Sequence, residues 1–236
     1  MIVQNQEFDR ACLLVGKEAL LNPAWREYGE YCLHREKGLR KKAFAHLSAF
    51  LEDAKSWEFE EKKAFVQWLC DKMDSVPWAD SGPYPNPLQN QLVFPFFQEW
   101  MRKEAHNAEV FALKARYTWD PEAYLKAIQI DPYNQRARVA LAWESIDAIS
   151  YSTHHLPEYF IGTEHEAINA VKTAEEHLSY FIDNERKKQM LAELRQEEQL
   201  LRDWIEFKTE EGNDFDQWCK DKGRRYNWMK AVYYSK

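Results

Sequence analysis

Apolar residues recur at three- and four-residue steps along most of this chain, a spacing that places them on one face of an α-helix. The clearest stripe comprises Ile168, Val171, Ala174, Leu178, Phe181 and Ile182. Few segments alternate at period two, and only seven of the 236 residues are glycine, which disfavours a sheet-rich fold. We therefore expect an all-α protein.

Helix boundaries are expected where proline and capping residues interrupt this periodicity. Asn22-Pro23 ends a first helix over about 7–21, and Asp120-Pro121 begins another that runs to residue 130. Thr163, with Glu166 three residues later, forms a capping-box pattern at the start of a long helix. That helix and the next one, which ends near residue 210, should form an antiparallel hairpin. Further helices are expected over 58–73 and 96–117.

A proline-rich segment interrupts the helical pattern. Five of the nine prolines lie between residues 75 and 95, so this segment is expected to be a loop. The chain then consists of N-terminal helical hairpins over 1–74, a Pro- and aromatic-rich loop over 75–95, and further hairpins over 96–236. The two helical parts can also form one continuous domain. The loop is either a connector held to the body by its aromatic residues or a partner-binding element.

The charge and the termini exclude several classes of protein. The net charge is −7, with 32 Lys and Arg against 39 Asp and Glu, whereas nucleic-acid-binding proteins usually carry a basic face. The short basic run over 220–225 is interpreted as a solvated turn between two helices. No apolar run reaches membrane-spanning length, and residues 1–7 lack a signal-peptide pattern. We expect a cytoplasmic protein that binds neither nucleic acid nor membrane, with Cys12, Cys32, Cys70 and Cys219 as reduced core thiols.

No catalytic or metal-binding motif stands out. The chain lacks a GxSxG elbow, a phosphate-binding loop and a GxGxxG fingerprint. His154 and His155 lie near His165 and two glutamates, but their spacing matches no metal motif. His177 is expected on the surface, and His34, His46 and His106 stand alone in the sequence. These observations predict no enzyme, no catalytic residue, no metal and no cofactor.

Two segments carry the spacing of a helical repeat. Trp25-x2-Tyr28-Gly29-x2-Cys32 begins one, and Tyr124, Ala127 and Pro132 follow Ala108 and Phe111 in the other. Both segments resemble tetratricopeptide repeats, which are 34-residue helix–turn–helix units. The resemblance covers about a third of the chain and implies stacked antiparallel hairpins in an irregular α-solenoid. An irregular helical globule is the alternative packing.

The resemblance also implies that the protein binds another protein or a peptide, because tetratricopeptide repeats hold ligands in a groove lined by the first helix of each pair. Transferred by register, the groove positions are Arg26 and Glu30 in the first unit and Arg102 and Glu109 in the second. If the proline-rich segment binds the partner, Trp78 and Tyr84 are its candidate contacts. The oligomeric state stays open.

The leading hypothesis is a non-enzymatic protein-binding helical module. Its most concrete form is a bacterial immunity or antitoxin-like protein that neutralises a partner by surface complementarity, which suits the small size, acidic charge and aromatic content of the chain. One alternative is an adaptor or regulatory scaffold that binds a peptide in a helical groove. The other is an unrecognised metal- or ligand-dependent enzyme.

Overall fold

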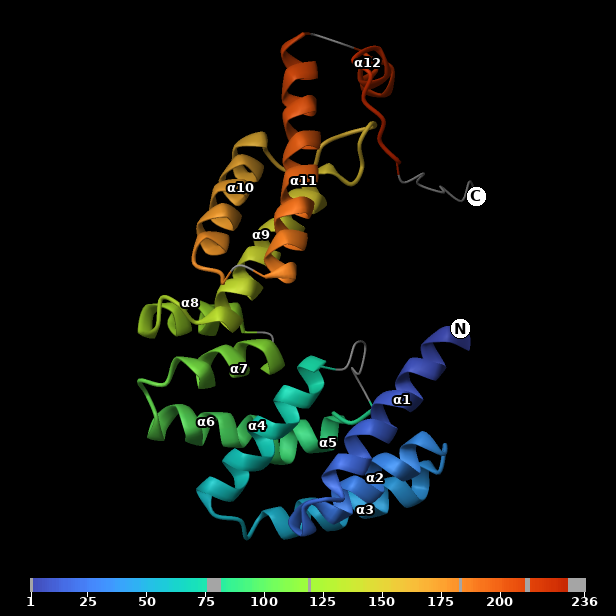
Figure 1. Cartoon of the computed structure of the whole chain (residues 1–236), viewed down its shortest axis with the longest axis vertical. Coiled ribbons are helices and arrows are strands. Elements are labelled where there is room, and N and C mark those ends of the chain that lie inside the picture. The colour runs from blue at the N-terminus through green and yellow to red at the C-terminus, as the bar shows by residue number, and fades with distance from the viewer. Residues whose placement is uncertain (1, 76–81, 119, 183, 211–212, 229–236) are drawn as a thin grey trace. The chain divides into compact units, whose positions relative to one another are not determined.

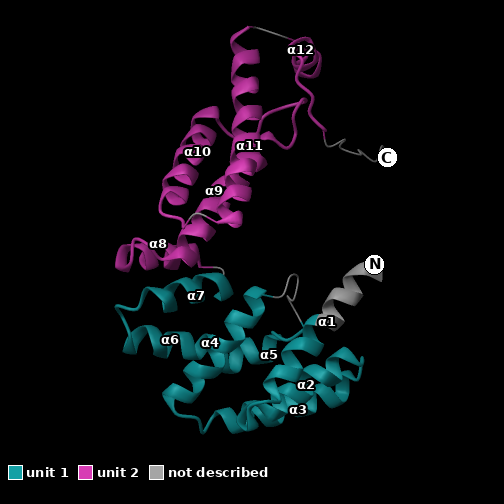
Figure 2. Ribbon diagram, viewed as in Figure 1, with its two compact units in different colours: residues 1–119 teal, residues 120–236 magenta. Residues whose placement is uncertain are grey.

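The structure, a computed structural model, describes residues 2–75, 82–118, 120–182, 184–210 and 213–228. Within those residues the chain consists of helices and turns and contains no strand (Figure 1). The predicted all-α fold class is therefore confirmed. The helices divide into two compact units, residues 1–119 (unit 1) and 120–236 (unit 2), each with its own core (Figure 2).

Unit 1 contains the elements from α1 to α7. Their bounds are α1 (Ile2–Ala19), the 3-10 turn η1 (Pro23–Trp25), α2 (Arg26–Glu36), α3 (Arg40–Ala54), α4 (Phe59–Ser75), α5 (Asn86–Leu88), the π-helical turn η2 (Gln89–Val93), α6 (Phe94–Lys103) and α7 (Ala108–Thr118). α2 packs against both α1 and α3, so the first three helices form two successive hairpins.

Helices α1 and α2 approach closely because glycine occupies both sides of their contact. A Cβ atom on Gly16 would lie 2.9 Å from the Cβ atom of Cys32, and one on Gly29 would lie 2.9 Å from the side chain of Leu20. Any larger residue at either position would push the two backbones apart. The glycine of the repeat-like motif therefore has a packing role in the first hairpin.

The core of unit 1 is rich in aromatic rings. Phe50 and Phe65 have ring centroids 4.8 Å apart, and Tyr28 meets Phe65 edge-to-face at 5.2 Å. Trp25 and Trp68, both partly buried, close one side of this cluster with centroids 4.7 Å apart. Much of the aromatic content noted in the sequence thus contributes to the interior of one unit.

Two tyrosine hydroxyls attach the proline-rich segment to unit 1. The hydroxyl of Tyr28 donates to the carbonyl oxygen of Pro83 at 2.7 Å, and the hydroxyl of Tyr31 donates to that of Gly82 at 2.7 Å. All four atoms lie in a buried environment, where a carbonyl without a partner would be costly. From residue 82 onward the segment is held by α2.

The expected loop over 75–95 is wrong from residue 86 onward, because α5, η2 and α6 follow one another without interruption. Pro85 is the N-cap and Pro87 lies in the first turn, where a missing amide proton leaves no helical hydrogen bond unmade. Pro95 comes directly after the π-helical turn, in which the amide of Phe94 bonds to the carbonyl of Gln89. The main division of the chain lies instead at 119/120.

The single helix expected over 96–117 is two helices, α6 and α7. Glu104 leaves the helical conformation, with φ −123° and ψ 58°. Its carboxylate accepts hydrogen bonds from the indole nitrogen of Trp100 at 2.9 Å and the amide nitrogen of Asn107 at 2.7 Å, and it pairs with Lys63 of α4. These bonds fix the turn over 104–107, which the apolar periodicity alone does not reveal.

Unit 2 contains α8 (Pro121–Ile130), α9 (Gln135–Thr153), α10 (Glu164–Ser179), α11 (Glu185–Thr209) and α12 (Phe215–Asp221). α9 packs against α10 and α11, and the latter two also pack against each other as the expected hairpin (Figure 1). These three helices surround one core, whose buried members include Ile146, Ile149, Val171, Leu178, Met190 and Leu194.

Side-chain caps set most helix starts in unit 2. The capping box is confirmed, since the Thr163 hydroxyl accepts from the Glu166 amide at 3.2 Å and the Thr163 amide donates to the Glu166 carboxylate at 3.1 Å. The side chains of Asn134, Asn184 and Asp214 cap their helices by accepting from one backbone amide each. Asp120 precedes α8 as expected, although its side chain makes no capping hydrogen bond.

The α10 stripe differs from its expected composition at two positions. Ile168 and Ile182 are exposed, at 36% and 66%, whereas Ala167 is buried. Ile168 lies one residue beyond Ala167 and is therefore rotated by about 100° from the buried face. Ile182 follows the end of the helix. The inward face is formed by Ala167, Val171, Ala174 and Leu178.

A second cluster in unit 2 is aromatic and lies where α11 meets α12. Its buried members are Leu156, Trp204, Phe207, Phe215 and Cys219. Tyr226 and Trp228, which follow α12, pack against it. All four cysteines of the chain are buried and free of disulfides. Among the described helices, none has the length and apolar character needed to cross a membrane.

Candidate functional site

The groove residues predicted from the repeat register lie at two separate places in unit 1. Arg26 is exposed and Glu30 half-buried, one turn apart on α2, and a Glu30 oxygen lies 3.7 Å from the Nδ1 atom of His34. Arg102 is exposed on α6, and Glu109 is half-buried at the start of α7. Their contact with a partner stays a prediction.

The two aromatic candidates from the proline-rich segment have different outcomes. Tyr84 is only 6% exposed, and its ring packs edge-on against that of Tyr117 at 5.3 Å. It is therefore a core residue, and its prediction as a surface contact is corrected. Trp78 lies outside the described residues.

The structure brings together two histidines that appear isolated in the sequence. His34 of α2 and His46 of α3 have ring centroids 4.9 Å apart. The Nδ1 atom of His46 lies 2.7 Å from a carboxylate oxygen of Glu27, and that of His34 lies 2.9 Å from the Glu30 carbonyl oxygen. The two histidines are twelve positions apart in the sequence and lie on different helices, so no motif spacing identifies the pair. These contacts join two helices of one hairpin.

His177 is not on the surface, contrary to expectation. It is 6% exposed, and its Nδ1 atom lies 2.8 Å from a guanidinium nitrogen of the buried Arg138. Burial and the nearby positive charge of Arg138 lower the pKa of His177. Arg138 also donates to the carbonyl of Pro132 at 2.8 Å and lies 3.8 Å from the ring centroid of Tyr180. This buried pair connects α9 to α10.

Across the described residues, no group of three or more histidine, cysteine, aspartate or glutamate side chains is arranged to hold a metal ion. His154 and His155 instead contact each other, with tilted rings whose centroids lie 4.1 Å apart. The Nδ1 atom of His154 lies 2.6 Å from the carbonyl oxygen of Tyr151. His165, on α10, lies near the amide of Asn169, at 3.3 Å.

Unit 2 contains a cavity of about 440 Å³ beside its aromatic cluster. Three segments line it: the chain after α9, the last turns of α11, and the start of α12. The lining residues are Pro157, Glu158, Trp204, Phe207, Lys208, Asn213, Asp214 and Phe215. Four of these are apolar or aromatic and four are polar or charged, so the cavity combines an apolar wall with a mixed-charge rim.

The aromatic rings of the cavity wall contact one another. Phe215 meets Trp204 edge-to-face at 5.3 Å and lies 5.2 Å from Phe207. Phe160 stacks parallel to Trp204 at 6.0 Å. At the rim, the ammonium of Lys208 lies 5.7 Å from the centroid of a Trp204 ring, and the Asp214 carboxylate accepts from the amide of Gln217 at 2.9 Å. Asp214 therefore both caps α12 and borders the cavity.

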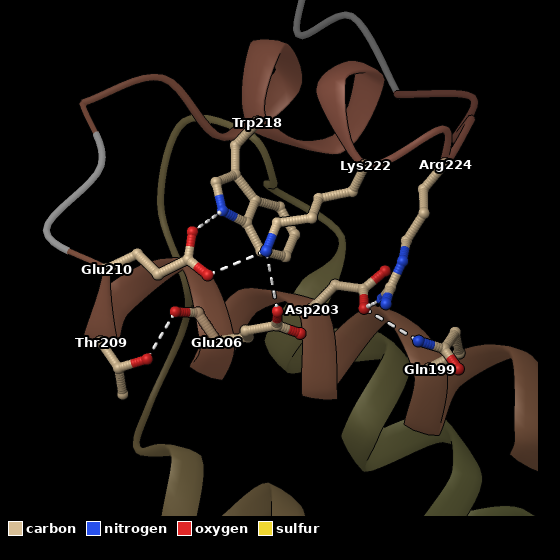
Figure 3. A network of polar contacts seen from close by, with 8 residues as sticks. All are labelled: Gln199, Asp203, Glu206, Thr209, Glu210, Trp218, Lys222 and Arg224. Carbon is tan, nitrogen blue, oxygen red and sulfur yellow. Dashed lines mark hydrogen bonds and ion pairs between the residues drawn. The ribbon is translucent and has the colours of Figure 1, made fainter.

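A polar network fixes α12 and the following residues to α11 (Figure 3). Its buried member is Asp203, which is fully inaccessible to solvent. The Asp203 carboxylate accepts from Gln199 at 2.8 Å and from the hydroxyl of Tyr226 at 2.5 Å, and it forms an ion pair with Arg224. Two hydrogen bonds and the positive charge of Arg224 thus compensate the buried charge, as a buried carboxylate requires.

The outer half of the network is solvent-exposed. The Lys222 ammonium lies 3.0 Å from a carboxylate oxygen of Glu206 and 2.8 Å from one of Glu210 (Figure 3). Glu210 also accepts from the indole of Trp218 at 2.7 Å, and the bonds from Lys222 and Trp218 lower the pKa of this carboxyl. The basic run over 220–225 is largely exposed and contains a turn, as expected, but no helix follows it over 224–228. Its Lys220, Lys222 and Arg224 pair with carboxylates of α11 and α12.

No protein-family model matches the chain, and searches of curated proteins and of solved structures returned no match. The resemblance to tetratricopeptide repeats therefore stays a prediction. The two helices of its second repeat, α7 and α8, belong to different compact units.

Sequence reasoning missed the cavity because its wall consists of residues that also belong to a core. Trp204, Phe207 and Phe215 are 8%, 6% and 2% exposed, so their apolar periodicity predicts burial and nothing more. One signal was present in the sequence: aromatic residues are dense both before and after Gly212. That density indicates a ring cluster, but only the fold shows that one side of the cluster borders a cavity.

Proposed function

We propose that this protein is a non-enzymatic, protein-binding helical module whose cavity on unit 2 receives an apolar side chain of a partner polypeptide. The observation that carries the proposal is the cavity, with Trp204, Phe207 and Phe215 on its wall and Glu158, Lys208 and Asp214 at its rim. Protein interfaces commonly combine an aromatic pocket with a polar rim, and buried aromatic residues provide much of their binding energy.

The chemistry of the lining residues favours binding over catalysis. None of the eight residues that line the cavity is a serine, threonine, cysteine or histidine, so the lining supplies no hydroxyl or thiol nucleophile and no imidazole base. Asp214, a candidate acid, is committed to capping α12. The ring contacts and the Asp203 network hold the wall in place before a partner arrives, which reduces the entropy cost of binding.

The test is to fill the cavity without disturbing the fold. Asn213 is an exposed residue of the cavity lining, so Asn213→Trp should place an indole in the cavity. Asn169→Trp, at an exposed position on α10 outside the lining, is the matched control. Affinity purification with quantitative mass spectrometry should recover one stoichiometric protein with the wild type and with Asn169→Trp. Asn213→Trp should lose that protein.

Two results would contradict the proposal. One is recovery of the same proteins at the same level with Asn213→Trp as with the wild type, which would show that the cavity binds no partner. The other is a small molecule or metal retained stoichiometrically by the pure wild-type protein and released by Asn213→Trp. That outcome would favour the ligand-dependent enzyme.

An immunity or antitoxin-like role is the narrower form of this proposal, with a toxin as the partner. The net charge of −7 supports it to the extent that a basic partner would be attracted. The direct test is co-expression with the toxin-like genes that neighbour its own. Protection by the wild type and by Asn169→Trp, with loss of protection in Asn213→Trp, would support this role. Absence of protection against every neighbouring gene product would reject it.

A further inference from the structure

One long stretch of unit 2 contains no positive side chain other than histidine. Residues 139–171 include no Lys or Arg, although the whole chain has 32. The same stretch contains five carboxylates: Glu144, Asp147, Glu158, Glu164 and Glu166. It covers most of α9, the following turn and the first half of α10. The stretch itself is therefore net negative at neutral pH.

The outer face of α9 places two of these carboxylates one turn apart. Glu144 and Asp147 are both exposed. They are three positions apart in the sequence, so they share a helix face. The described structure gives neither of them an ion pair with a cation. Partial burial and the neighbouring charge of Asp147 raise the pKa of Glu144. Two adjacent negative charges thus repel each other with no cation to relieve them.

A row of four rings begins on this face at Tyr151 and continues through the residues that follow the end of α9 at Thr153. The ring centroids of Tyr151 and His154 are 5.2 Å apart, those of His154 and His155 are 4.1 Å apart, and His155 stacks on Tyr159 at 4.6 Å. Tyr151 is 62% exposed and Tyr159 is 45% exposed. A single exposed tyrosine needs no explanation, but here four rings contact one another in a row, two pairs tilted and one stacked.

We propose that this face of α9 binds an arginine-rich segment of a partner polypeptide, and we call it the α9 face: Glu144, Asp147, Tyr151, His154, His155 and Tyr159. Guanidinium groups stack on aromatic rings and pair with carboxylates through two parallel hydrogen bonds, so a guanidinium matches both halves of the face. An ammonium matches the carboxylates but stacks less well, so arginine is preferred over lysine. The inference rests on the proposed function, because it assumes that the protein binds a polypeptide. It adds a second binding surface besides the cavity and the type of side chain that this surface binds.

The test is fluorescence anisotropy with a labelled hexa-arginine peptide and the full-length protein at low salt, with hexa-lysine for comparison. Replacing both carboxylates, Glu144→Lys with Asp147→Lys, should weaken hexa-arginine binding about tenfold. Replacing both tyrosines, Tyr151→Ala with Tyr159→Ala, should weaken hexa-arginine binding about fivefold and affect hexa-lysine less.

Matched controls separate this site from general attraction by the net charge. Glu52→Lys with Glu60→Lys makes the same change of charge at exposed positions of unit 1, and Tyr133→Ala removes a ring that is 68% exposed elsewhere in unit 2. Both controls should bind hexa-arginine nearly as the wild type does. Circular dichroism checks that each variant keeps its helical content.

Three outcomes would overturn the proposal. The first is equal weakening by the unit 1 charge reversals, which would show attraction by net charge alone. The second is hexa-lysine binding that matches hexa-arginine and responds equally to the tyrosine changes. The third is displacement of hexa-arginine by spermine at equal charge concentration, which would assign the face to any polycation. Asn213→Trp should leave hexa-arginine binding unchanged, so a failure here is distinguishable from a failure of the cavity proposal.

Discussion

The Glu104 carboxylate joins α6, the turn over 104–107 and α4. It accepts from Trp100 and Asn107 and pairs with Lys63, and these bonds lower its pKa from 4.5 to about 2. Its side chain is 27% exposed, so part of its electrostatic interaction is screened by water.

Glu104→Gln should therefore lower the free energy of unfolding by about 1–2 kcal/mol at neutral pH, because charge-assisted hydrogen bonds become neutral ones. Since the folded-state pKa lies below the unfolded value, this stability is present above pH 4.5 and is lost as the pH falls toward 2. Urea unfolding at several pH values measures both effects. Glu99→Gln, which breaks only the exposed pair with Lys103, is the control and should cost less than about 0.5 kcal/mol.

His177 gives unit 2 a pH dependence of its own. Its pKa is lowered from 6.5 by burial first and by Arg138 second, while Glu176 acts in the opposite direction. Below pH 6.5 the unfolded chain therefore binds a proton that the folded chain excludes, so folding stability falls with pH until the folded-state pKa is reached.

His177→Gln keeps an acceptor near Arg138 but removes the titration. The variant should consequently lose less stability than the wild type between pH 7 and pH 5 in urea unfolding experiments. His165→Gln, at an exposed position on α10, should follow the wild-type pH dependence. An unchanged slope in His177→Gln would contradict the assigned role of the buried imidazole.

Residue-scale chemistry was the hardest part to predict from the sequence. The periodicity of α10 does not distinguish the buried His177 from the exposed His165, because burial depends on the approach of Arg138 from α9. The pairing of His34 with His46 likewise depends on how two helices turn back on each other. Tyr84 lies in a proline-rich segment, which predicts an exposed loop, yet the fold buries its side chain against Tyr117.

At the scale of elements, the close contact between α1 and α2 predicts whether Gly29→Ala raises or lowers the free energy of unfolding. Alanine is favoured over glycine in an exposed helix interior by about 1 kcal/mol, so Gly29→Ala would be stabilising if α2 were open at that point. Because a Cβ there meets Leu20 at 2.9 Å and the Gly16 carbonyl oxygen at 3.0 Å, we expect it to lower the free energy of unfolding by about 1–3 kcal/mol. Urea unfolding measures this change in the free energy of unfolding. Ser48→Ala, at an exposed position, is the control and should be nearly neutral. A stabilised Gly29→Ala variant would rule out this close helix contact.

The attachment of α12 to α11 depends on Asp203. Asp203→Ala leaves the Arg224 guanidinium and the Tyr226 hydroxyl without their acceptor, so amide hydrogen exchange over 213–228 should accelerate at least about tenfold. The nearby control is Asp221→Ala, which removes only an exposed bond from Gln217. Exchange that is equally slow in Asp203→Ala would show that the aromatic contacts alone hold α12.

Helices were predicted well where local signals agree and poorly where side chains from distant segments decide. The capping box at Thr163 and the helix start at Pro121 depend only on neighbouring residues, so both can be predicted from the sequence. The break at Glu104 depends on Lys63 from α4 as well as on Trp100, and the continuity from 86 to 103 depends on a π-helical turn. Neither the break nor the continuity changes the spacing of apolar residues in the sequence.

At the scale of the whole molecule, the all-α class followed from periodicity, whereas the division into units did not. Prolines indicated a boundary over 75–95, but two tyrosine hydroxyls of α2 bind that segment to unit 1. The division lies instead at 119/120, next to Asp120-Pro121, which the sequence marked only as a helix start. Composition indicated a folded protein rich in rings but could not show that the rings of unit 2 border a cavity.

The central claim, that a partner polypeptide enters this cavity, is tested most directly by site-specific photo-cross-linking in the native host. A photoreactive phenylalanine replaces Lys208 at the cavity rim, and the same group replaces the exposed Glu60 of unit 1 as the control. The account predicts that irradiation links one defined protein to position 208, that Asn213→Trp abolishes this product, and that position 60 gives none. A product of equal yield at position 60, or one that persists when Asn213→Trp fills the cavity, would contradict it.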